Sequence, residues 1–356
     1  MRVLFVIKSV ATLGGGAERV FAEITNGLYE RGYDIEIVTF NAPGTKSFYA
    51  LSDSITRHDL GPQSLNPRQL FSLRKKILEL GPQCVVAFMP SSYVPVAFAL
   101  IDSGIHVFAS EHNVPARYRT VLAKWALLNA SVPAIHKFTA VSQQMKHAYP
   151  PWIRRKMVVI QNPVSDPSGS VADIRAKGRR KRLLAVGRLH AQKDHLCLIR
   201  AFSHIVDSVH DWDLRILGEG DERSKLENEI RFLGLQDRVE MPGAVTDICA
   251  EYVSSQLYVI PSLYESQGLA TVEAMAHGLP AIGFVDCPGT NEIITNGVNG
   301  VLVDPRHDRP QALAQALQSL MLDDDFRCRL ALAALAQKID PQINVVLDHW
   351  EKLLAI

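Results

Sequence analysis

Short hydrophobic runs alternate with amphipathic segments along most of the chain. The first half opens with the apolar run RVLFVI, a glycine-rich turn GGGAER, the helical pattern VFAEITNGLYERG and a second apolar run DIEIVTF. Similar short runs follow at CVVAFM, HVFASE, KFTAVS and KMVVIQNPV. Because apolar runs that alternate with helix-length segments are typical of βαβ units, the pattern predicts a parallel sheet with helices on both faces.

The alternation lapses once and then restarts. Residues 164–182, VSDPSGSVADIRAKGRRKR, have the Ser, Asp, Pro, Gly and basic composition of a linker. After them come the apolar runs LLAVG, LRILG, RVEMPG, LYVIPS, PAIGF and GVLV. We therefore predict an α/β protein with two doubly wound, Rossmann-like domains facing a central cleft, residues 1–165 and 183–340, joined by a linker at 166–182.

The last segment predicts a further amphipathic helix. In residues 341–356 the side chains of Val346, Trp350, Leu353 and Leu354 fall on one side at helical spacing. We expect this helix to pack back towards the first domain.

Composition narrows the class of protein. Hydrophobic residues make up 47% of the 356 residues and charged residues 21%, as in an ordinary globular protein. No uncharged apolar run reaches about 18 residues, the length that spans a bilayer, and we expect a cytoplasmic protein. The five cysteines form no C-x-x-C pair, so the sequence indicates neither a disulfide framework nor a zinc cluster.

Charge is divided unevenly between the two halves. Residues 1–166 carry 18 Lys and Arg against 11 Asp and Glu, a net charge of +7, whereas residues 167–356 carry 20 against 26, a net charge of −6. A basic half favours an anionic partner, either a membrane surface or a nucleic acid. Uneven scatter without any partner would give the same count.

Two patterns at predicted strand ends are typical of anion binding. Gly14, Gly15 and Gly16 lie between a strand and a helix, where backbone N–H groups suit an anion or a close-packed ligand. Their turn matches neither G-x-G-x-x-G nor the P-loop, which disfavours those two kinds of site. In VGRLHAQKDH, Arg188 and Lys193 follow a strand of the second domain, and a diphosphate would satisfy both cations.

Two glutamates with seven residues between them mark the stretch ESQGLATVEAMAHGLPAIG. A helix that starts near Gly268 places Glu273 about 40° from Leu269, on the apolar side, where a carboxylate needs hydrogen-bond donors or the hydroxyls of a ligand. Glu265 precedes the helix in the loop after VIPS, at a strand's carboxyl end. The two carboxylates would therefore reach different parts of one ligand.

Two further clusters of polar residues lie beside predicted strands. ASEHN places Ser110, Glu111 and His112 at a strand end of the first domain, where they would face the same cleft. DWD, by contrast, places Asp211 and Asp213 at the amino end of a strand, away from the cleft. We therefore predict no metal site.

These motifs together resemble the retaining, nucleotide-sugar-dependent glycosyltransferases of family four, which have the GT-B architecture. The resemblance spans almost the whole chain and depends on the order of GGAER, SEH, VGRL, LGEGD, RVEMPG, the Glu265 to Glu273 spacing, EAMAHGLPAIG and GTNEIITNGVNGVLV. It implies an acceptor-binding first domain and a donor-binding second domain. It also implies retention of anomeric configuration, with no divalent metal and no cofactor beyond the nucleotide sugar.

The resemblance assigns roles to residues at matching positions. Arg188 and Lys193 would hold the donor diphosphate, Glu273 would bind the ribose hydroxyls, Glu265 would approach the transferred sugar, and His112 would contact that sugar or the departing group. The catalytic residues so implied are Glu265, His112, Arg188 and Lys193. Those that bind the donor are Gly16, Gly187, Arg188, Lys193, Gly218, Gly268, Leu269 and Glu273. Those on the acceptor side are Gly14, Gly15 and Glu111.

The sequence departs from the family at one place that bears on the substrate. Ser266, Gln267 and Gly268 stand where the family often has Gly-Phe-Gly, and their polar groups would suit a sugar hydroxyl or an acetamido group. The expected donor is a UDP-sugar, in preference to a GDP-sugar, that carries a hexose or an N-acetylhexosamine. The expected acceptor is a lipid-linked saccharide in surface polysaccharide or glycan assembly.

The basic first domain fits an acceptor held at an anionic membrane. Two predicted cationic helices contain Arg68, Arg74, Lys75 and Lys76, and Arg117, Arg119 and Lys124. We expect peripheral attachment to the inner face of the plasma membrane; a solvated helix face is the alternative.

Two other kinds of protein remain as alternatives. One is an epimerase or phosphorylase on the same architecture. The other is a non-catalytic nucleotide or nucleic-acid binder, suggested by KGRRKR. We predict no nucleic-acid partner, because carboxylates in the cleft would repel a phosphate backbone.

Overall fold

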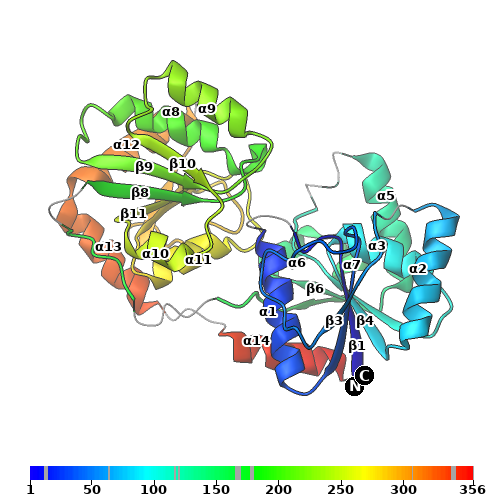
Figure 1. Ribbon diagram of the computed structural model, residues 1–356. Coiled ribbons are helices and arrows are strands. Elements are labelled where there is room, and N and C mark those ends of the chain that lie inside the picture. The colour runs from blue at the N-terminus through cyan, green and yellow to red at the C-terminus, as the bar shows by residue number, and fades with distance from the viewer. Residues whose placement is uncertain are drawn as a thin grey trace. The chain divides into compact units, whose positions relative to one another are not determined.

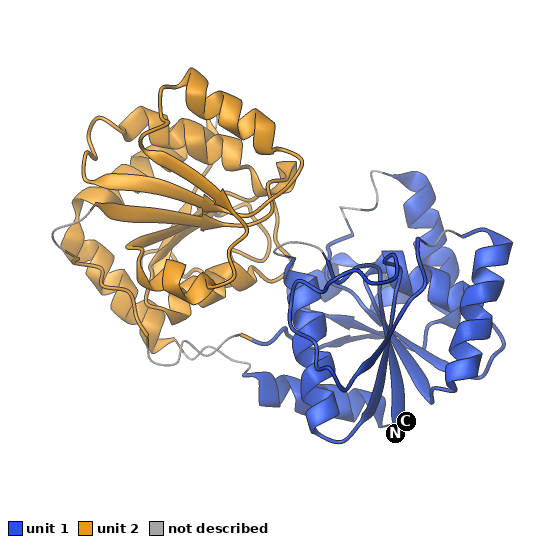
Figure 2. Cartoon of the chain, in the orientation of Figure 1, with its two compact units in different colours: residues 1–163, 341–356 blue, residues 164–340 orange. Residues whose placement is uncertain are grey.

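The computed structural model divides the chain into two units, residues 1–163 with 341–356 (unit 1) and residues 164–340 (unit 2), coloured separately in Figure 2. It describes residues 1–11, 15–62, 65–115, 118, 121–164, 170–176, 180–306, 308–337 and 342–355. None of the helices in these ranges is both long enough and apolar enough to cross a membrane.

Unit 1 contains a seven-stranded parallel sheet in the order β3-β2-β1-β4-β5-β6-β7. Its strands are β1 (Arg2–Ile7), β2 (Asp34–Thr39), β3 (Thr56–Asp59), β4 (Cys84–Phe88), β5 (His106–Ser110), β6 (Lys137–Ala140) and β7 (Met157–Val159). Its helices are α1 (Gly16–Glu30), α2 (Pro67–Leu80), α3 (Pro90–Ala99), α5 (Leu122–Ser131), η1 (Val132–Ala134), α6 (Gln143–Ala148), α7 (Pro151–Arg154) and α14 (Ile343–Leu354). Helices α1 and α14 lie on one side of this sheet, and α2, α3 and α5 lie on the other (Figure 1).

Unit 2 contains a six-stranded parallel sheet in the order β10-β9-β8-β11-β12-β13. Its strands are β8 (Lys181–Val186), β9 (Trp212–Leu217), β10 (Val239–Gly243), β11 (Leu257–Ile260), β12 (Ala281–Phe284) and β13 (Gly300–Val303). Its helices are η2 (Ala191–Lys193), α8 (His195–Ile205), α9 (Arg223–Phe232), α10 (Ile248–Val253), α11 (Leu269–Ala276), α12 (Arg309–Leu322) and α13 (Asp324–Ala336). Each unit therefore has the predicted Rossmann-like arrangement.

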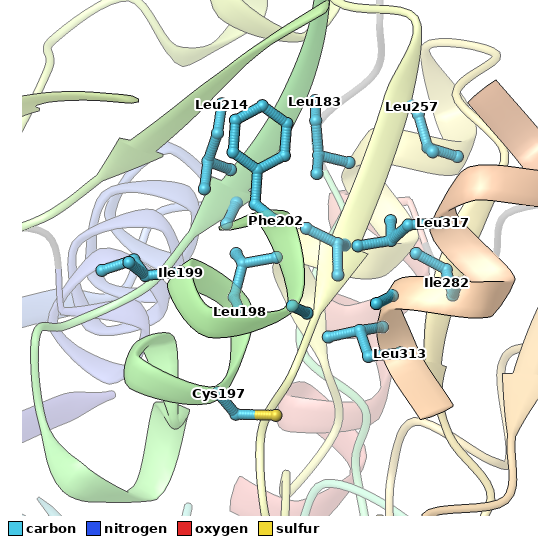
Figure 3. Packing of buried hydrophobic residues seen from close by; sticks show 14 of the residues in the cluster. Leu183, Cys197, Leu198, Ile199, Phe202, Leu214, Leu257, Ile282, Leu313 and Leu317 are labelled. Carbon is cyan, nitrogen blue, oxygen red and sulfur yellow. The ribbon is translucent and has the colours of Figure 1, made fainter. Parts of the chain in front are cut away.

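Apolar side chains from both layers fill the core of unit 2. Figure 3 shows Leu198 and Phe202 of α8 turned towards Leu183 of β8 and Leu214 of β9, and all four side chains are fully buried. Because helices cover both faces of the sheet, its central strands carry continuous apolar runs rather than alternating ones. At about 1.5–3 kcal/mol for each fully buried aliphatic or aromatic side chain, this burial is the main stabilising contribution to the unit.

The predicted linker is wrong in two respects. Strand β8 begins at Lys181, so the last two residues of 166–182 belong to the sheet. Residues 170–176 pack on unit 2: Ala172 N donates to His277 O at 2.8 Å, Gln256 Nε2 donates to Asp173 O at 3.1 Å, and Ile174 is buried. An isolated isoleucine in a polar stretch gives little signal in a sequence pattern, yet its burial anchors the segment.

The sequence pattern also missed strand β3. Its sequence, TRHD, contains no apolar run, because β3 is an edge strand that pairs only with β2 in the described part of the sheet. Polar contacts hold it in place: His58 Nε2 lies 2.7 Å from Glu36 Oε2, and the Thr39 hydroxyl donates to Asp59 Oδ1 at 2.6 Å. An edge strand with polar side chains is protected against pairing with other chains.

Helix α14 packs on α1 within unit 1. Arg31, the C-cap residue of α1, donates to Asp348 and Glu351 at 2.7 Å each, and the methyl groups of Leu347 lie against Gly27. The buried residues of α14 are Val346, Leu347, Trp350 and Leu354. Leu353, predicted on this side, is only partly buried, and Leu347 takes its place.

Candidate active site

The first part of the site is the turn that follows β8. Gly187 and Arg188 come directly after the strand, and η2 ends at Lys193. The aliphatic part of Lys193 lies against Gly187, where an added Cβ would come within 3.1 Å of Lys193 Cδ and Cε. Both cations therefore lie on one short turn at the carboxyl end of β8.

Lys193 is in direct contact with Glu265. Lys193 Nζ lies 2.6 Å from Glu265 Oε1, and the Ser262 hydroxyl donates to the same oxygen at 2.6 Å. Gln192 Nε2 donates to Tyr264 O at 2.8 Å and ties the two loops together. The side chains of Lys193 and Glu265 are 17% and 9% exposed, so their charges interact more strongly than a surface pair would. The sequence predicted both residues but not their contact.

Arg188 has a different environment on the same turn. No residue that the structure describes forms an ion pair or a hydrogen bond with its guanidinium, and the residue is half-buried. A guanidinium offers five N–H donors in a fork that matches phosphate oxygens. The turn can therefore bind an anion without first breaking a pair at Arg188.

Two glycines allow the surrounding loops to approach each other. Gly218 follows β9 with φ of 137°, and a Cβ there would lie 2.1 Å from Gly187 O. Gly268 precedes α11 with φ of 65°, in the left-handed region. Any other residue would force the turn after β8 and the turn after β9 apart, so Gly218 shapes the site through its backbone.

Glu273 lies on the buried side of α11, which confirms the prediction of its position. It is 4% exposed, and Tyr252 of α10 donates its hydroxyl proton to Glu273 Oε2 at 3.1 Å. Leu269, placed on the same side by the helical pattern, is partly exposed at the start of the helix. The carboxylate is thus oriented from beneath by a tyrosine that the sequence pattern did not single out.

A second tyrosine shows that the two glutamates lie in one region. Tyr258 of β11 is fully buried, and burial, followed by the negative charge of Glu265, raises its pKa well above the usual value. The charge of Glu273 adds to this effect, while the nearby hydroxyl group of Thr271 opposes it. Both carboxylates are therefore within electrostatic reach of one hydroxyl group.

His195 begins α8 directly behind the cationic turn. Burial lowers its pKa to about 4, and the nearby charge of Lys193 contributes to the same shift. The imidazole is therefore neutral at pH 7 and adds no charge to the site.

The depressed pKa of His195 predicts that unit 2 loses stability in mild acid. Between the unfolded value of about 6.5 and the folded value of about 4, the unfolded chain binds more protons, so stability falls as the pH is lowered. We expect this group to reduce the free energy of unfolding by about 2 kcal/mol from pH 7 to pH 5. Urea unfolding at both pH values should show that His195→Phe removes this part of the pH dependence.

The control for that measurement is His204→Phe, which changes an exposed histidine on the same helix. It should leave the pH dependence as in the wild type. Equal pH dependence in the wild type and His195→Phe would contradict the assignment.

In unit 1, His112 follows β5 at the carboxyl end of the sheet. Its ring stacks on Phe88, with centroids 5.2 Å apart and planes inclined by 20°, and its Nε2 lies 2.9 Å from Ser110 Oγ. Phe88 is stacked in turn on Trp350 of α14. Burial lowers the pKa of His112 to about 4, although the residue as a whole is only partly buried.

The surroundings of Glu111 do not fit its predicted role on the acceptor side. Its carboxylate is fully buried and accepts hydrogen bonds from Tyr93 Oη at 2.6 Å, Tyr118 Oη at 3.1 Å, and the backbone N–H groups of His112 and Asn113 at 2.9 Å each. A carboxylate engaged by four internal donors has little capacity left for an acceptor saccharide. Glu111 instead holds the loop that carries His112 in place.

The predicted glycine turn is described in part. Gly14 lies outside the described residues. Gly15 is the N-cap of α1, and Gly16 is the first residue of the helix. An added Cβ on Gly15 would lie 2.0 Å from a carboxylate oxygen of Glu18, so a larger residue there would displace that side chain.

Each unit contains residues in contact with the predicted groups that the sequence pattern did not reveal. Ser262 and Tyr252 bind the two glutamates, and Tyr93 and Tyr118 bind Glu111. Ser262 alone had a signal, since it ends the run VIPS at a strand's carboxyl end. The tyrosines reach the carboxylates from other elements, which no local pattern records.

Two family models match most of the chain, and both describe glycosyltransferases. Residues 14–166 match the family model "Glycosyltransferase Family 4", and residues 170–337 match "Glycosyl transferases group 1". An "Uncharacterized glycosyltransferase" of Haemophilus influenzae is 24% identical over 99% of both chains. The Campylobacter jejuni "GalNAc-alpha-(1->4)-GalNAc-alpha-(1->3)-diNAcBac-PP-undecaprenol alpha-1,4-N-acetyl-D-galactosaminyltransferase" is 24% identical over 100% of this chain and 98% of its own length. The structure of Anabaena HepE in complex with UDP and glucose has a TM-score of 0.80 at 19% identity and covers 100% of this chain and 99% of its own, which shows a shared fold.

Proposed function

Because the chain belongs to the glycosyltransferases that combine a Family 4 domain with a group 1 domain, we propose that it transfers a hexose or an N-acetylhexosamine from a UDP-sugar, in preference to a GDP-sugar, to a lipid-linked saccharide. Surface polysaccharide or glycan assembly is the process that this reaction serves. The observation that carries the proposal is the turn after β8, which carries both Arg188 and Lys193 and in which Lys193 contacts Glu265 at 2.6 Å. A cationic turn adjoining a carboxylate suits a diphosphate joined to a sugar.

The proposed reaction needs charge stabilisation on the departing diphosphate. The bond between the anomeric carbon and the diphosphate oxygen breaks, the acceptor hydroxyl oxygen bonds to the same face of that carbon, and its proton passes to the departing phosphate oxygen. Negative charge develops on the diphosphate, where Arg188 and Lys193 stabilise it electrostatically. These two cations act in place of a divalent metal, and the anomeric configuration is retained.

The carboxylates complete the proposed donor site. Glu273, oriented by Tyr252, accepts hydrogen bonds from the ribose hydroxyls, and the turn at Gly268 and Leu269 supplies backbone N–H groups to the diphosphate. Glu265 approaches the transferred sugar while Ser262 keeps its carboxylate in place. His112 contacts the sugar or the departing group, and the turn at Gly15 and Gly16 leaves room for the acceptor.

Two comparisons support the choice of substrates. The HepE structure contains UDP and glucose, which favours a UDP-linked sugar here. The Campylobacter relative carries an undecaprenol-linked saccharide in its name, which favours a lipid-linked acceptor. An N-acetylhexosamine in that relative's name also agrees with the polar Ser266 and Gln267 of this chain.

In the basic run KGRRKR, the described cations Arg180 and Lys181 do not favour binding to nucleic acid. Arg180 donates to Asp213 Oδ1 at 2.7 Å, and Lys181 Nζ lies 3.3 Å from Asp211 Oδ2. These cations are neutralised by the carboxylates of the DWD motif, so their charge is not available to a phosphate backbone.

A panel of nucleotide sugars tests the proposed function. The purified protein should release nucleoside diphosphate from one UDP-sugar far faster than from the others, and only when a membrane lipid extract supplies the acceptor. An epimerase would instead convert the nucleotide sugar without releasing diphosphate, and a binding protein would leave every donor intact. Either of these results would overturn the proposal.

We also propose that unit 1 binds the inner face of the plasma membrane through α2 and α5, which both pack on α3 (Figure 1). Helix α5 is short of polar side chains, yet most of it is exposed: Leu122 is 78% exposed and Lys124 lies two residues away. On α2, Phe71 is 70% exposed, with Arg68 and Lys75 exposed on the same helix. Apolar side chains flanked by cations suit an anionic bilayer.

Three of the cations predicted for this surface need correction or lie outside the described residues. Arg74 donates to Ala99 O and Ile101 O at 2.8 Å each, so it binds the end of α3 rather than a lipid. Arg117 and Arg119 lie outside the described residues. The attraction therefore depends on Arg68, Lys75, Lys76 and Lys124.

Replacing Leu122 with aspartate should weaken membrane binding at least about tenfold, because burying one leucine is worth about 1.5–3 kcal/mol and each 1.4 kcal/mol is tenfold. Sedimentation with phosphatidylglycerol vesicles at low and high salt measures the bound fraction. The matched control is Phe232→Asp, which changes an 84% exposed side chain of unit 2 and should have no effect. Absence of wild-type binding at low salt would contradict the proposal.

A further inference from the structure

A chain of hydroxyl groups leads from the interior of unit 1 to His112. Ser110 and Thr139 are register partners at the carboxyl ends of the neighbouring strands β5 and β6. Thr139 Oγ1 lies 3.1 Å from Ser110 Oγ, and Ser110 Oγ lies 2.9 Å from His112 Nε2. Both hydroxyl-bearing residues are buried, with exposures of 1% and 2%. The imidazole is therefore tied to the protein through one of its two nitrogens.

The direction of this hydrogen-bond chain follows from the need to satisfy buried donors. If Thr139 donates to Ser110, then Ser110 can donate its own proton to His112 Nε2, and every hydroxyl proton has an acceptor. In the reverse direction, His112 Nε2–H would donate to Ser110 and Ser110 to Thr139, which would leave the Thr139 proton without an acceptor. Ser110 is the one side-chain partner of the Thr139 hydroxyl among the described residues. A buried donor without a partner costs about 1–3 kcal/mol, so the first direction is favoured.

The protonation state of the His112 ring decides which of its nitrogens can donate a hydrogen bond. Burial lowers the pKa of His112 to about 4, so the imidazole carries a single proton at neutral pH. Stacking on Phe88, which Trp350 supports from behind, fixes the plane of the ring. A neutral ring that accepts at Nε2 must carry its proton on Nδ1.

We infer that Ser110 and Thr139 are positioning residues that set the tautomer of His112, so that Nδ1–H is the hydrogen-bond donor presented to the ligand. The structure shows no hydrogen-bond partner for Nδ1 among its described residues. An N–H at this place would bind an oxygen acceptor, a sugar hydroxyl or a phosphate oxygen. The identity of that ligand rests on the proposed glycosyl transfer, whereas the tautomer itself does not.

The nitrogen-15 spectrum of histidine-labelled protein tests the tautomer directly. At pH 7 the long-range 15N–1H pattern of His112, assigned by its loss in His112→Gln, should show a protonated Nδ1 and an unprotonated Nε2. Ser110→Ala should shift the equilibrium towards the Nε2–H tautomer, because Nε2 then loses the hydroxyl that donates to it. A protonated Nε2 in the wild type, or no change in Ser110→Ala, would overturn the inference.

A matched variant separates this effect from a loss of core packing. Thr25→Val removes another buried hydroxyl of unit 1, one that donates to Phe21 O at 2.8 Å within α1, and should leave the His112 signals unchanged. Loss of the His112 pattern in Thr25→Val as well would show that general packing sets the tautomer, against the inference.

Kinetics distinguish this inference from the proposed function. Ser110→Ala should lower kcat about tenfold or more, as supporting contacts of active groups commonly do, with a smaller change in the KM for the donor. A changed tautomer with unchanged kcat would overturn the catalytic role. A wild type with Nδ1–H that transfers no sugar from any donor would overturn the proposed function and leave the tautomer assignment standing.

Discussion

Replacing Glu265 with glutamine should lower the rate of sugar transfer by about 10²- to 10³-fold while unit 2 remains folded. The glutamine keeps the shape of the side chain and can still accept from Ser262, but it removes the negative charge that faces Lys193 at 2.6 Å. Groups that stabilise developing charge in a site withdrawn from water are commonly worth this much. Product formation under single-turnover conditions measures the effect on the chemical step.

Glu251→Gln is the control for a general effect of removing a buried ion pair. Glu251 accepts from Arg215 at 2.7 and 2.8 Å in the same unit, and its side chain is similarly withdrawn from solvent. It should cost stability without changing the rate of transfer. Equal loss of rate in the two variants would show that Glu265 acts only through the stability of the unit.

Replacing Arg188 with alanine should weaken the binding of UDP about 100-fold, which corresponds to about 2.7 kcal/mol. The guanidinium has no ion pair among the described residues, so a bound diphosphate would be its charge partner and the variant leaves no carboxylate behind without a counter-ion. The free energy of unfolding should therefore change little, by less than about 0.5 kcal/mol. Isothermal titration with UDP measures the affinity, and urea unfolding measures the stability.

Arg200→Ala serves as the matched arginine variant for that titration. Arg200 lies on α8 of the same unit and donates to Glu229 at 2.6 Å on the surface. It should bind UDP as the wild type does. If Arg188→Ala also bound UDP with unchanged affinity, Arg188 would not belong to the donor site.

The strands could be predicted wherever they form continuous apolar runs in the sequence. Strands such as β4 and β11, buried on both faces, appear in the sequence as continuous apolar runs. Strand β3 could not be found this way, because its place at the sheet edge depends on polar contacts with β2. Ile174 was missed for a similar reason, since its burial depends on unit 2 and not on its polar neighbours in sequence.

In the candidate site, too, the sequence pattern could not identify partners that lie on other helices or loops. The helical pattern placed Glu273 on the buried side of α11, but it could not identify Tyr252, which approaches from α10. Lys193 and Glu265 were both predicted, yet they are 72 positions apart in the sequence, so the contact between them could not be predicted. Sequence spacing locates groups along one element, whereas the choice of a partner across elements is decided by the tertiary fold.

Glu111 illustrates how a strand-end residue can be misassigned. Its position suggested contact with the acceptor, but Tyr93 and Tyr118 occupy its carboxylate oxygens from other segments. Arg74 was misassigned in the same way, because its carbonyl partners at the end of α3 are 25 and 27 residues away. In both cases the sequence indicated a charged side chain that needs a partner, but it did not indicate that the partner lies within unit 1.

The central claim is that Arg188 and Lys193 bind the diphosphate of a nucleotide sugar while Glu273 binds its ribose. A crystal structure of the protein soaked with UDP tests it most directly. Electron density for the diphosphate should lie in contact with both cations, with the ribose hydroxyls on the Glu273 carboxylate. Density for UDP elsewhere on the protein, with these side chains unchanged, would contradict it.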